Sequence, residues 1–144
     1  MSRLNRIQHE YVEFIPARLE EGRLYISQKY RTATHLCCCG CGMEVVTPLN
    51  PAKWHLSNHG DTVSLHPSIG NWGFPCRSHY WITSGKIRWA SAMSDGQIRR
   101  VRANDHRAVE LQARRESGVD TPKAQTAQPS SQVTNFIAWL RRLW

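Results

Sequence analysis

The chain has 144 residues, of which 40% are hydrophobic and 21% charged, so it can bury one modest core but leaves little room for a second full domain. Its 19 Lys and Arg against 11 Asp and Glu give a net charge of +8, which favours acidic partners, nucleic acid being the commonest. No apolar run approaches the roughly 20 residues of a membrane span and the N-terminal residues lack a signal-peptide core, so we expect a cytoplasmic protein with no membrane span.

Short β segments separated by Gly and Pro occupy the chain up to about residue 90. The apolar and β-branched runs predict strands at 11–15, 23–27, 43–46, 62–65, 79–83 and 86–90. Ser84 and Gly85 join the last two runs, and a two-residue connection of this kind is typical of a tight hairpin. No long helical period interrupts the segments, so residues 1–94 are predicted to form a small β-rich domain.

A C-terminal extension of different character follows this domain. Ser94 or Asp95 is a suitable cap for a basic helix over residues 95–116. Residues 117–132 have the Ser, Thr, Gln and Pro content of a disordered linker, and residues 133–144 have the apolar spacing of a short amphipathic helix. Residues 97–144 carry nine basic and four acidic side chains, so any contact with nucleic acid is expected through this basic tail.

Five cysteines in a chain without an export signal indicate a metal site rather than a disulfide framework. Thiolates on a tight Gly-containing turn, such as CCCGCG at residues 37–42, suit structural zinc, and four protein ligands leave no open position for chemistry. The spacing leaves two ligand sets open. One set pairs Cys38-x-x-Cys41 with Cys76-x-x-His79. The other set is Cys37, Cys39, Cys41 and Cys76.

Four residues have the side chains that nucleophilic catalysis requires: His35, Ser68, Ser78 and His79. A serine needs an adjacent base, usually histidine, and neighbours on an extended strand point to opposite faces, so Ser78 and His79 are not expected to pair. We favour Ser68 with His79, because Ser68 lies in a predicted Pro-Ser-Ile-Gly turn whose free N–H groups suit an oxyanion. Ser78 with His35 is the second choice. The alternative to catalysis is that all three residues have structural roles. Ser68 would then hydrogen-bond within its own turn, His79 would be a zinc ligand, and His35 would be a buried core histidine.

The order of four sequence segments resembles a small bacterial zinc-binding family. The segments lie between about Tyr11 and Ala90 and read VEFIPARLEEGRLYIS, TATHLCCCGCGMEVVTPL, VSLHPSIGNWGFPCRSHYWI and KIRWA. The pieces CGCG, PSIGNW and CxSHYWI are specific when they occur together. Members of this family are encoded beside bacterial ubiquitin-like conjugation genes in antiphage islands. The resemblance therefore implies a serine-type peptidase that trims or removes the ubiquitin-like protein, in antiviral defence.

The resemblance also implies one of the two ligand sets. The family motif Cys-x-Cys-Gly-Cys-Gly falls on Cys37, Cys39 and Cys41. Cys38 then occupies the variable position, Cys76 completes the set, and His79 is free for catalysis. The resemblance implies nothing about the chain beyond about Ser94.

The combined prediction is a mainly β, zinc-stabilised domain with a helical, partly disordered C-terminal extension. It would act as a serine-type peptidase on the C-terminal tail of a ubiquitin-like protein or on its conjugates, with backbone N–H groups near Gly70 holding the oxyanion. Two other functions are open. One is a non-catalytic, zinc-supported binding module for nucleic acid or an acidic protein. The other is a metallohydrolase in which a histidine among the ligands leaves an open metal position.

Overall fold

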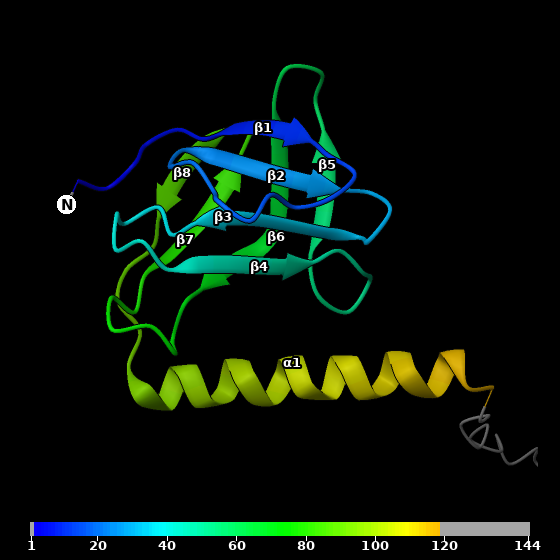
Figure 1. The fold of residues 1–144 in the computed structure, drawn as a ribbon. Coiled ribbons are helices and arrows are strands. Elements are labelled where there is room, and N and C mark those ends of the chain that lie inside the picture. The colour runs from blue at the N-terminus through cyan, green and yellow to red at the C-terminus, as the bar shows by residue number, and fades with distance from the viewer. Residues whose placement is uncertain (1, 119–144) are drawn as a thin grey trace, which may run out of the picture.

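Two four-stranded sheets and one helix make up the fold in the computed structural model, which describes residues 2–118 (Figure 1). The sheet orders are β1-β2-β3-β4 and β5-β6-β7-β8. The elements are β1 (Gln8–Tyr11), β2 (Arg23–Ser27), β3 (Thr32–Leu36), β4 (Glu44–Pro48), β5 (His55–Asn58), β6 (Val63–Gly70), β7 (His79–Thr83), β8 (Lys86–Trp89) and α1 (Asp95–Glu116). The predicted mainly β class with a C-terminal helix is therefore confirmed.

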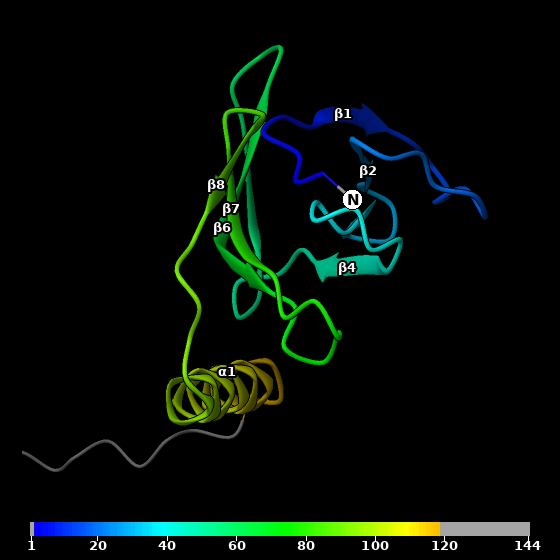
Figure 2. The ribbon, with the colours of Figure 1, turned by 90° about the vertical axis from the view of Figure 1, so that its left-hand side faces the viewer.

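The two sheets lie face to face and bury one core between them (Figure 2). Alternate residues of β4, β7 and β8 point inward, as a strand buried on one face requires, whereas β2 and β3 are buried on both faces. In β7, Tyr80 and Ile82 are buried while His79 and Trp81 are only half-buried on the other face. The core residues are Ile7, Leu24, Ile26, Ala33, Cys37, Cys38, Val45, Val63, Leu65, Ile69, Tyr80, Ile82 and Ile87.

The N-terminal segment ties the two sheets together at one end. The Ile7 N–H donates to the Gly85 carbonyl at 2.9 Å, and the Ile87 N–H donates to the Asn5 carbonyl at 2.9 Å, so this segment runs beside β8. The chain then continues into β1, which pairs in parallel with β2 of the other sheet.

The strand predictions over 23–27 and 79–83 are confirmed, and the other predicted strands shift or extend. The segments predicted at 43–46, 62–65 and 86–90 correspond to β4, β6 and β8. The predicted hairpin is confirmed, because Thr83 pairs with Lys86 and both Ser84 and Gly85 have positive φ (47° and 69°).

One strand predicted from the sequence is misplaced, and two strands of the structure were not predicted. The strand expected at 11–15 lies instead at β1, whose polar Gln-His-Glu-Tyr sequence is held by its pairing with β2. Strands β3 and β5 were not expected, because Thr-Ala-Thr-His-Leu and His-Leu-Ser-Asn lack the apolar alternation of a half-buried strand. Pairing with neighbouring strands, rather than local sequence, creates these elements.

Ser68 lies in a strand, so the turn predicted for Pro-Ser-Ile-Gly is wrong. Strand β6 continues to Gly70, with a shift in its pairing with β7 between Leu65 and Ile69. Pro67 has no N–H for a regular ladder, and the inward alternation is kept across the irregularity, because Val63, Leu65 and Ile69 all lie in the core. After the shift Ile69 is buried, whereas Ser68 and Gly70 are half-buried on the outer face.

The predicted helix over residues 95–116 is confirmed as α1. Ser94 is its N-cap, and Ser94 and Gln97 form a reciprocal capping box. Ile98 is the one buried helix residue, and the Arg77–Asp95 ion pair at 2.6 Å joins the helix start to the β6–β7 loop. Among the described residues, no helix is long and apolar enough to cross a membrane. The predictions for the linker beyond residue 118 and for the helix at 133–144 lie outside the described residues.

Candidate active site

Four cysteine sulfurs meet where the β3–β4 loop lies against the β6–β7 loop. The Sγ atoms of Cys37, Cys39, Cys41 and Cys76 all lie within 4.8 Å of one another. The separations are 3.5 Å for Cys37–Cys39, 3.9 Å for Cys37–Cys76 and 3.8 Å for Cys41–Cys76. Tetrahedral zinc with Zn–S bonds of about 2.3 Å spaces its sulfurs about 3.8 Å apart. The cluster therefore fits one tetrahedral metal ion with four thiolate ligands.

Tight backbone turns bring three of these cysteines to one point. The Gly40 N–H donates to the Cys37 carbonyl at 3.1 Å, and Gly40 and Gly42 adopt φ of 84° and 78°, which is where glycine is favoured. The Cys37 N–H donates to the Met43 carbonyl at 2.8 Å, which closes the loop at the base of β4. The CCCGCG sequence thus folds into a loop that can wrap an ion.

Cys38 and His79 are not part of the cluster, so among the described residues the structure does not bring together the ligand set built on them. The Cys38 side chain is fully buried in the core, and burial raises the pKa of its thiol to about 12. Cys76 behaves differently. Burial opposes its ionisation, but hydrogen bonds from Ser78 and the neighbouring thiols lower the pKa of Cys76 to about 7. The environment thus favours the thiolate at Cys76, whereas burial raises the pKa of Cys39 and Cys41.

Ser68 and His79 lie within hydrogen-bond distance of each other across the outer face of the second sheet. Ser68 Oγ is 2.8 Å from His79 Nε2. The pairing follows from register, because Gly70 faces His79 across the β6–β7 ladder and Ser68 lies on the same face two residues away. The distance lies in the range of about 2.6–3.2 Å that a serine and its general base require.

The His79 imidazole is enclosed by aromatic rings rather than by a carboxylate. Its centroid lies 4.9 Å from that of Trp72 and 5.4 Å from that of Trp81. Burial lowers the pKa of His79, an effect that the Ser91 backbone partly opposes. Nδ1 is buried and has no hydrogen-bond partner among residues 2–118. Burial therefore favours the neutral ring, and Nε2 accepts from Ser68 in the tautomer that carries its proton on Nδ1.

Comparison with known proteins gives one family match. A family described as "Bacterial ubiquitination-like system serine protease (BubE)" matches residues 11–90, more than half of the chain. The chain belongs to the BubE family. No curated protein and no solved structure matches it.

The BubE match covers both sites in full. All four clustered cysteines, Ser68 and His79 lie inside residues 11–90, and α1 lies outside them. The family description makes a serine the expected nucleophile, and the geometry places Ser68 beside His79. Ser64 also contacts a histidine, His59, at 3.0 Å, but Ser64 is buried and its hydroxyl accepts from the Ser84 N–H. The expected resemblance to a serine-peptidase family linked to a bacterial ubiquitin-like system is confirmed.

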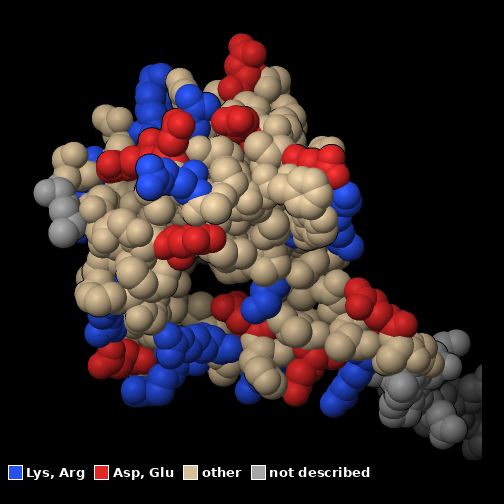
Figure 3. All heavy atoms as spheres, in the orientation of Figure 1, with Lys and Arg blue, Asp and Glu red and all other residues tan. Residues whose placement is uncertain are grey.

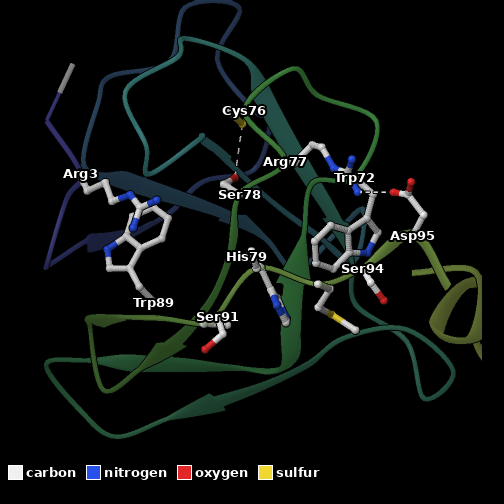
Figure 4. A pocket seen from close by; sticks show the side chains of 13 residues that line it. Arg3, Trp72, Cys76, Arg77, Ser78, His79, Trp89, Ser91, Ser94 and Asp95 are labelled. Atoms are coloured by element: carbon white, nitrogen blue, oxygen red, sulfur yellow. Dashed lines mark hydrogen bonds and ion pairs between the residues drawn. The ribbon is translucent and has the colours of Figure 1, made fainter. Parts of the chain in front are cut away.

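The second serine–histidine combination, Ser78 with His35, is not brought together as a pair. Ser78 points away from His79 and toward Cys76 (Figure 4). Its hydroxyl lies 3.0 Å from Cys37 Sγ and accepts from Asn71 Nδ2 at 2.9 Å. Ser78 therefore contacts the cysteine cluster and has no histidine as a hydrogen-bond partner among the described residues.

His35 lies in the core, where it contacts Tyr80 rather than a serine. Its Nε2 is 2.8 Å from the Tyr80 hydroxyl. Complete burial lowers the pKa of His35 to about 4, so the ring is neutral near pH 7. The sequence did not identify Asn71 or Tyr80, whose polar atoms link this histidine to Ser78 through contacts of 3.5 and 2.9 Å. No motif spacing indicates such a network, because its members are joined only by sheet pairing.

A cleft beside Ser68 and His79 runs between the β domain and α1. Its volume is about 590 Å³, and Figure 3 shows the molecule hollowed between the strands and the helix. Trp72 lies over the Gly70 backbone in this cleft, so closely that a Cβ at Gly70 would overlap the indole. The sequence missed Trp72 as a site residue, although GNW directly follows PSI. The cleft is large enough to hold a segment of peptide.

Proposed function

We propose that the chain is a serine peptidase in which Ser68 is the nucleophile and His79 the general base. The observation that carries the proposal is the 2.8 Å contact between Ser68 Oγ and His79 Nε2 at an open cleft. Membership of a family described as a serine protease supports the same chemistry.

The reaction is acyl transfer to water. Ser68 Oγ attacks the scissile carbonyl while His79 Nε2 accepts the hydroxyl proton. His79 then donates that proton to the leaving amine, and the C–N bond breaks. A water molecule attacks the acyl-enzyme with His79 again as base, which releases the carboxylate product and restores Ser68.

The backbone near Gly70 is the proposed oxyanion donor. The Asn71 N–H donates to the Ser78 carbonyl at 2.9 Å, so these residues form a hydrogen-bonded pair of the antiparallel ladder. Narrow and wide pairs alternate, which turns the Gly70 N–H away from β7. An N–H in that orientation, two residues from Ser68, suits a developing oxyanion.

The C-terminal tail of a ubiquitin-like protein is the proposed substrate, either as a precursor or in a conjugate. Strand β5 pairs with β6 only from Val63 to His66, so no described strand covers the β5 side of the Ser68 segment. An extended peptide can add along such an edge through main-chain hydrogen bonds. The family's link to a bacterial ubiquitination-like system supports this substrate class. A role in antiviral defence is proposed on the resemblance in sequence.

Zinc at the four cysteines is proposed as a structural ion. When bound, it crosslinks the β3–β4 and β6–β7 loops and performs no chemistry, because four thiolates fill its coordination sphere. His79 lies outside the ligand set, which argues against the metallohydrolase alternative.

Labelling with a fluorophosphonate serine probe, with the modified residue identified by mass spectrometry, tests the proposal. We expect modification of Ser68, and we expect it to disappear in His79→Ala while metal content and melting temperature stay unchanged. The Ser78→Ala variant is the matched control and should still be labelled at Ser68.

Two outcomes would contradict the proposal. Modification of Ser78 would move the nucleophile to the second candidate. A folded, metal-loaded protein without any labelling would favour the non-catalytic binding module.

A further inference from the structure

Helix α1 forms one wall of the cleft that holds Ser68 and His79. Val101, Arg102 and Asp105 line the cleft from the helix, and Lys53 lines it from the β4–β5 loop. The helix begins after residue 90, where the family match ends. The chain therefore adds its own wall to a site that the matched residues already contain.

The helix start is fixed, which gives Arg102 a defined place. The Ser94 cap, the Arg77–Asp95 ion pair and buried Ile98 attach the first turns of α1 to the β domain. Arg102 lies four residues after Ile98, so both side chains lie on neighbouring positions of the same helix side.

The charges that line the cleft sum to a positive value. Lys53 and Arg102 outnumber the single carboxylate of Asp105, and none of the three has an ion-pair partner within residues 2–118. A second hollow shares Trp72 and Arg102 with the cleft, and Arg99 also lines it. Arg77 lines this hollow too, but its charge is balanced by the ion pair with Asp95. In Figure 3, Lys and Arg side chains gather over the first half of α1.

We propose that Arg102, with Lys53 across the cleft, forms a subsite for a carboxylate side chain of the peptide substrate. This inference rests on the proposed peptidase function. A peptide segment beside Ser68 passes between the two cations, and a Glu or Asp there gains an ion pair that Gln or Asn does not. The Asp105 carboxylate repels an acidic side chain in the cleft, so it should reduce the preference for Glu or Asp that Arg102 and Lys53 produce.

Positional scanning with internally quenched peptides tests the subsite. At each position in turn, Glu is compared with Gln, and the ratio of kcat/KM values is measured. We expect one position at which Glu is favoured by about two- to fivefold, the range of an exposed ion pair. The preference should decrease as salt concentration rises.

Matched helix variants assign the preference to Arg102. Arg102→Gln should remove the Glu preference, and Asp105→Asn should increase it. Arg107→Gln removes the same charge from an exposed position of α1 that does not line the cleft, so it should keep the preference. Equal Glu and Gln rates at every position, or a preference unchanged in Arg102→Gln, would overturn the subsite.

A binding measurement separates failure of the subsite from failure of the proposed function. Fluorescein-labelled Glu and Gln peptides are titrated with the Ser68→Ala protein, and affinity is followed by fluorescence anisotropy. If the wild-type protein cleaves no peptide but Ser68→Ala binds the Glu peptide more tightly through Arg102, the subsite holds and the peptidase proposal fails. If neither peptide is preferred in binding or cleavage, the subsite is rejected.

Discussion

The cysteine cluster and the Ser68–His79 pair meet along residues 76–80 and lie on opposite faces of that stretch. Ser78 and Tyr80 turn inward, toward Cys37 and His35, whereas His79 turns outward to Ser68. Strand alternation thus separates the group that holds the loops from the group proposed for chemistry. The comparison indicates that damage to the cluster should unfold the site, while damage to the pair should leave the fold intact.

Loss of a metal ligand is expected to have the largest effect. In Cys41→Ser, one thiolate of a four-ligand site is removed, and a structural zinc contributes about 10 kcal/mol or more to the folded state. That exceeds the margin of many small domains, which is about 5–15 kcal/mol. We expect loss of bound metal together with loss of the cooperative melting transition, measured by elemental analysis and circular dichroism.

Cys38→Ala is the matched control, because Cys38 is adjacent in sequence but lies in the core. It should retain one metal ion per chain and lose only about 1–3 kcal/mol of unfolding free energy, as ordinary core substitutions do. Equal metal loss in both variants would show that position in the cluster does not matter.

Replacement of the proposed catalytic pair comes next. Ser68→Ala and His79→Ala should each lower kcat/KM by about 10²- to 10⁴-fold or more, because general acid–base transfer from a positioned histidine supplies that much. The free energy of unfolding should change by only about 1 kcal/mol, the net contribution of one hydrogen bond. Peptide hydrolysis and chemical denaturation measure the two quantities.

The metal content of His79→Ala decides between the two roles considered for this histidine. A full complement of metal with lost hydrolysis agrees with the proposed base. Loss of metal would instead make His79 a ligand and remove the basis of the pair.

The sequence contained the four clustered cysteines, but spacing alone could not select them from the five. Cys38 and Cys39 are adjacent, and by spacing either could bind a metal ion together with Cys41. In the structure Cys38 lies in the core and Cys39 lies in the cluster. Local spacing does not record that difference. The family resemblance indicated the set that the structure brings together.

The backbone conformation at Ser68 could not be predicted from the sequence. Pro-Ser-Ile-Gly has the composition of a turn, yet pairing with β7 keeps it extended as far as Gly70. Strands β3 and β5 depend on the same kind of non-local pairing. By contrast, the Ser84-Gly85 hairpin and the α1 cap are encoded by adjacent residues, and both were predictable.

Gly70→Ala tests whether the packing of Trp72 beside His79 supports hydrolysis, and its effect on the rate should be smaller than that of Ser68→Ala or His79→Ala. A methyl group at this position would overlap the Trp72 indole, which packs against His79 at 4.9 Å. Such overpacking costs about 1–3 kcal/mol, and displacement of the ring by about 1 Å can lower the rate by about 100-fold. Gly73→Ala, whose Cβ meets no atom within 4 Å, should change neither stability nor hydrolysis. Comparable losses in the two variants would contradict the packing argument.

The smallest expected effect is on the pH dependence of hydrolysis, and it isolates the aromatic enclosure of His79. Burial disfavours the imidazolium and lowers the pKa of His79 below its usual 6.5, so the base stays neutral and active as the pH falls below that value. We expect the acid limb of kcat/KM to have its midpoint below pH 6.5, provided that metal content is constant over the range. Trp72→Ala admits water to the ring and should move the midpoint upward, toward 6.5. An unshifted midpoint in Trp72→Ala would mean that Trp72 does not set the pKa of His79. The aromatic rings on the outer face of β7 would then matter less to the proposed base than the four cysteines matter to the fold.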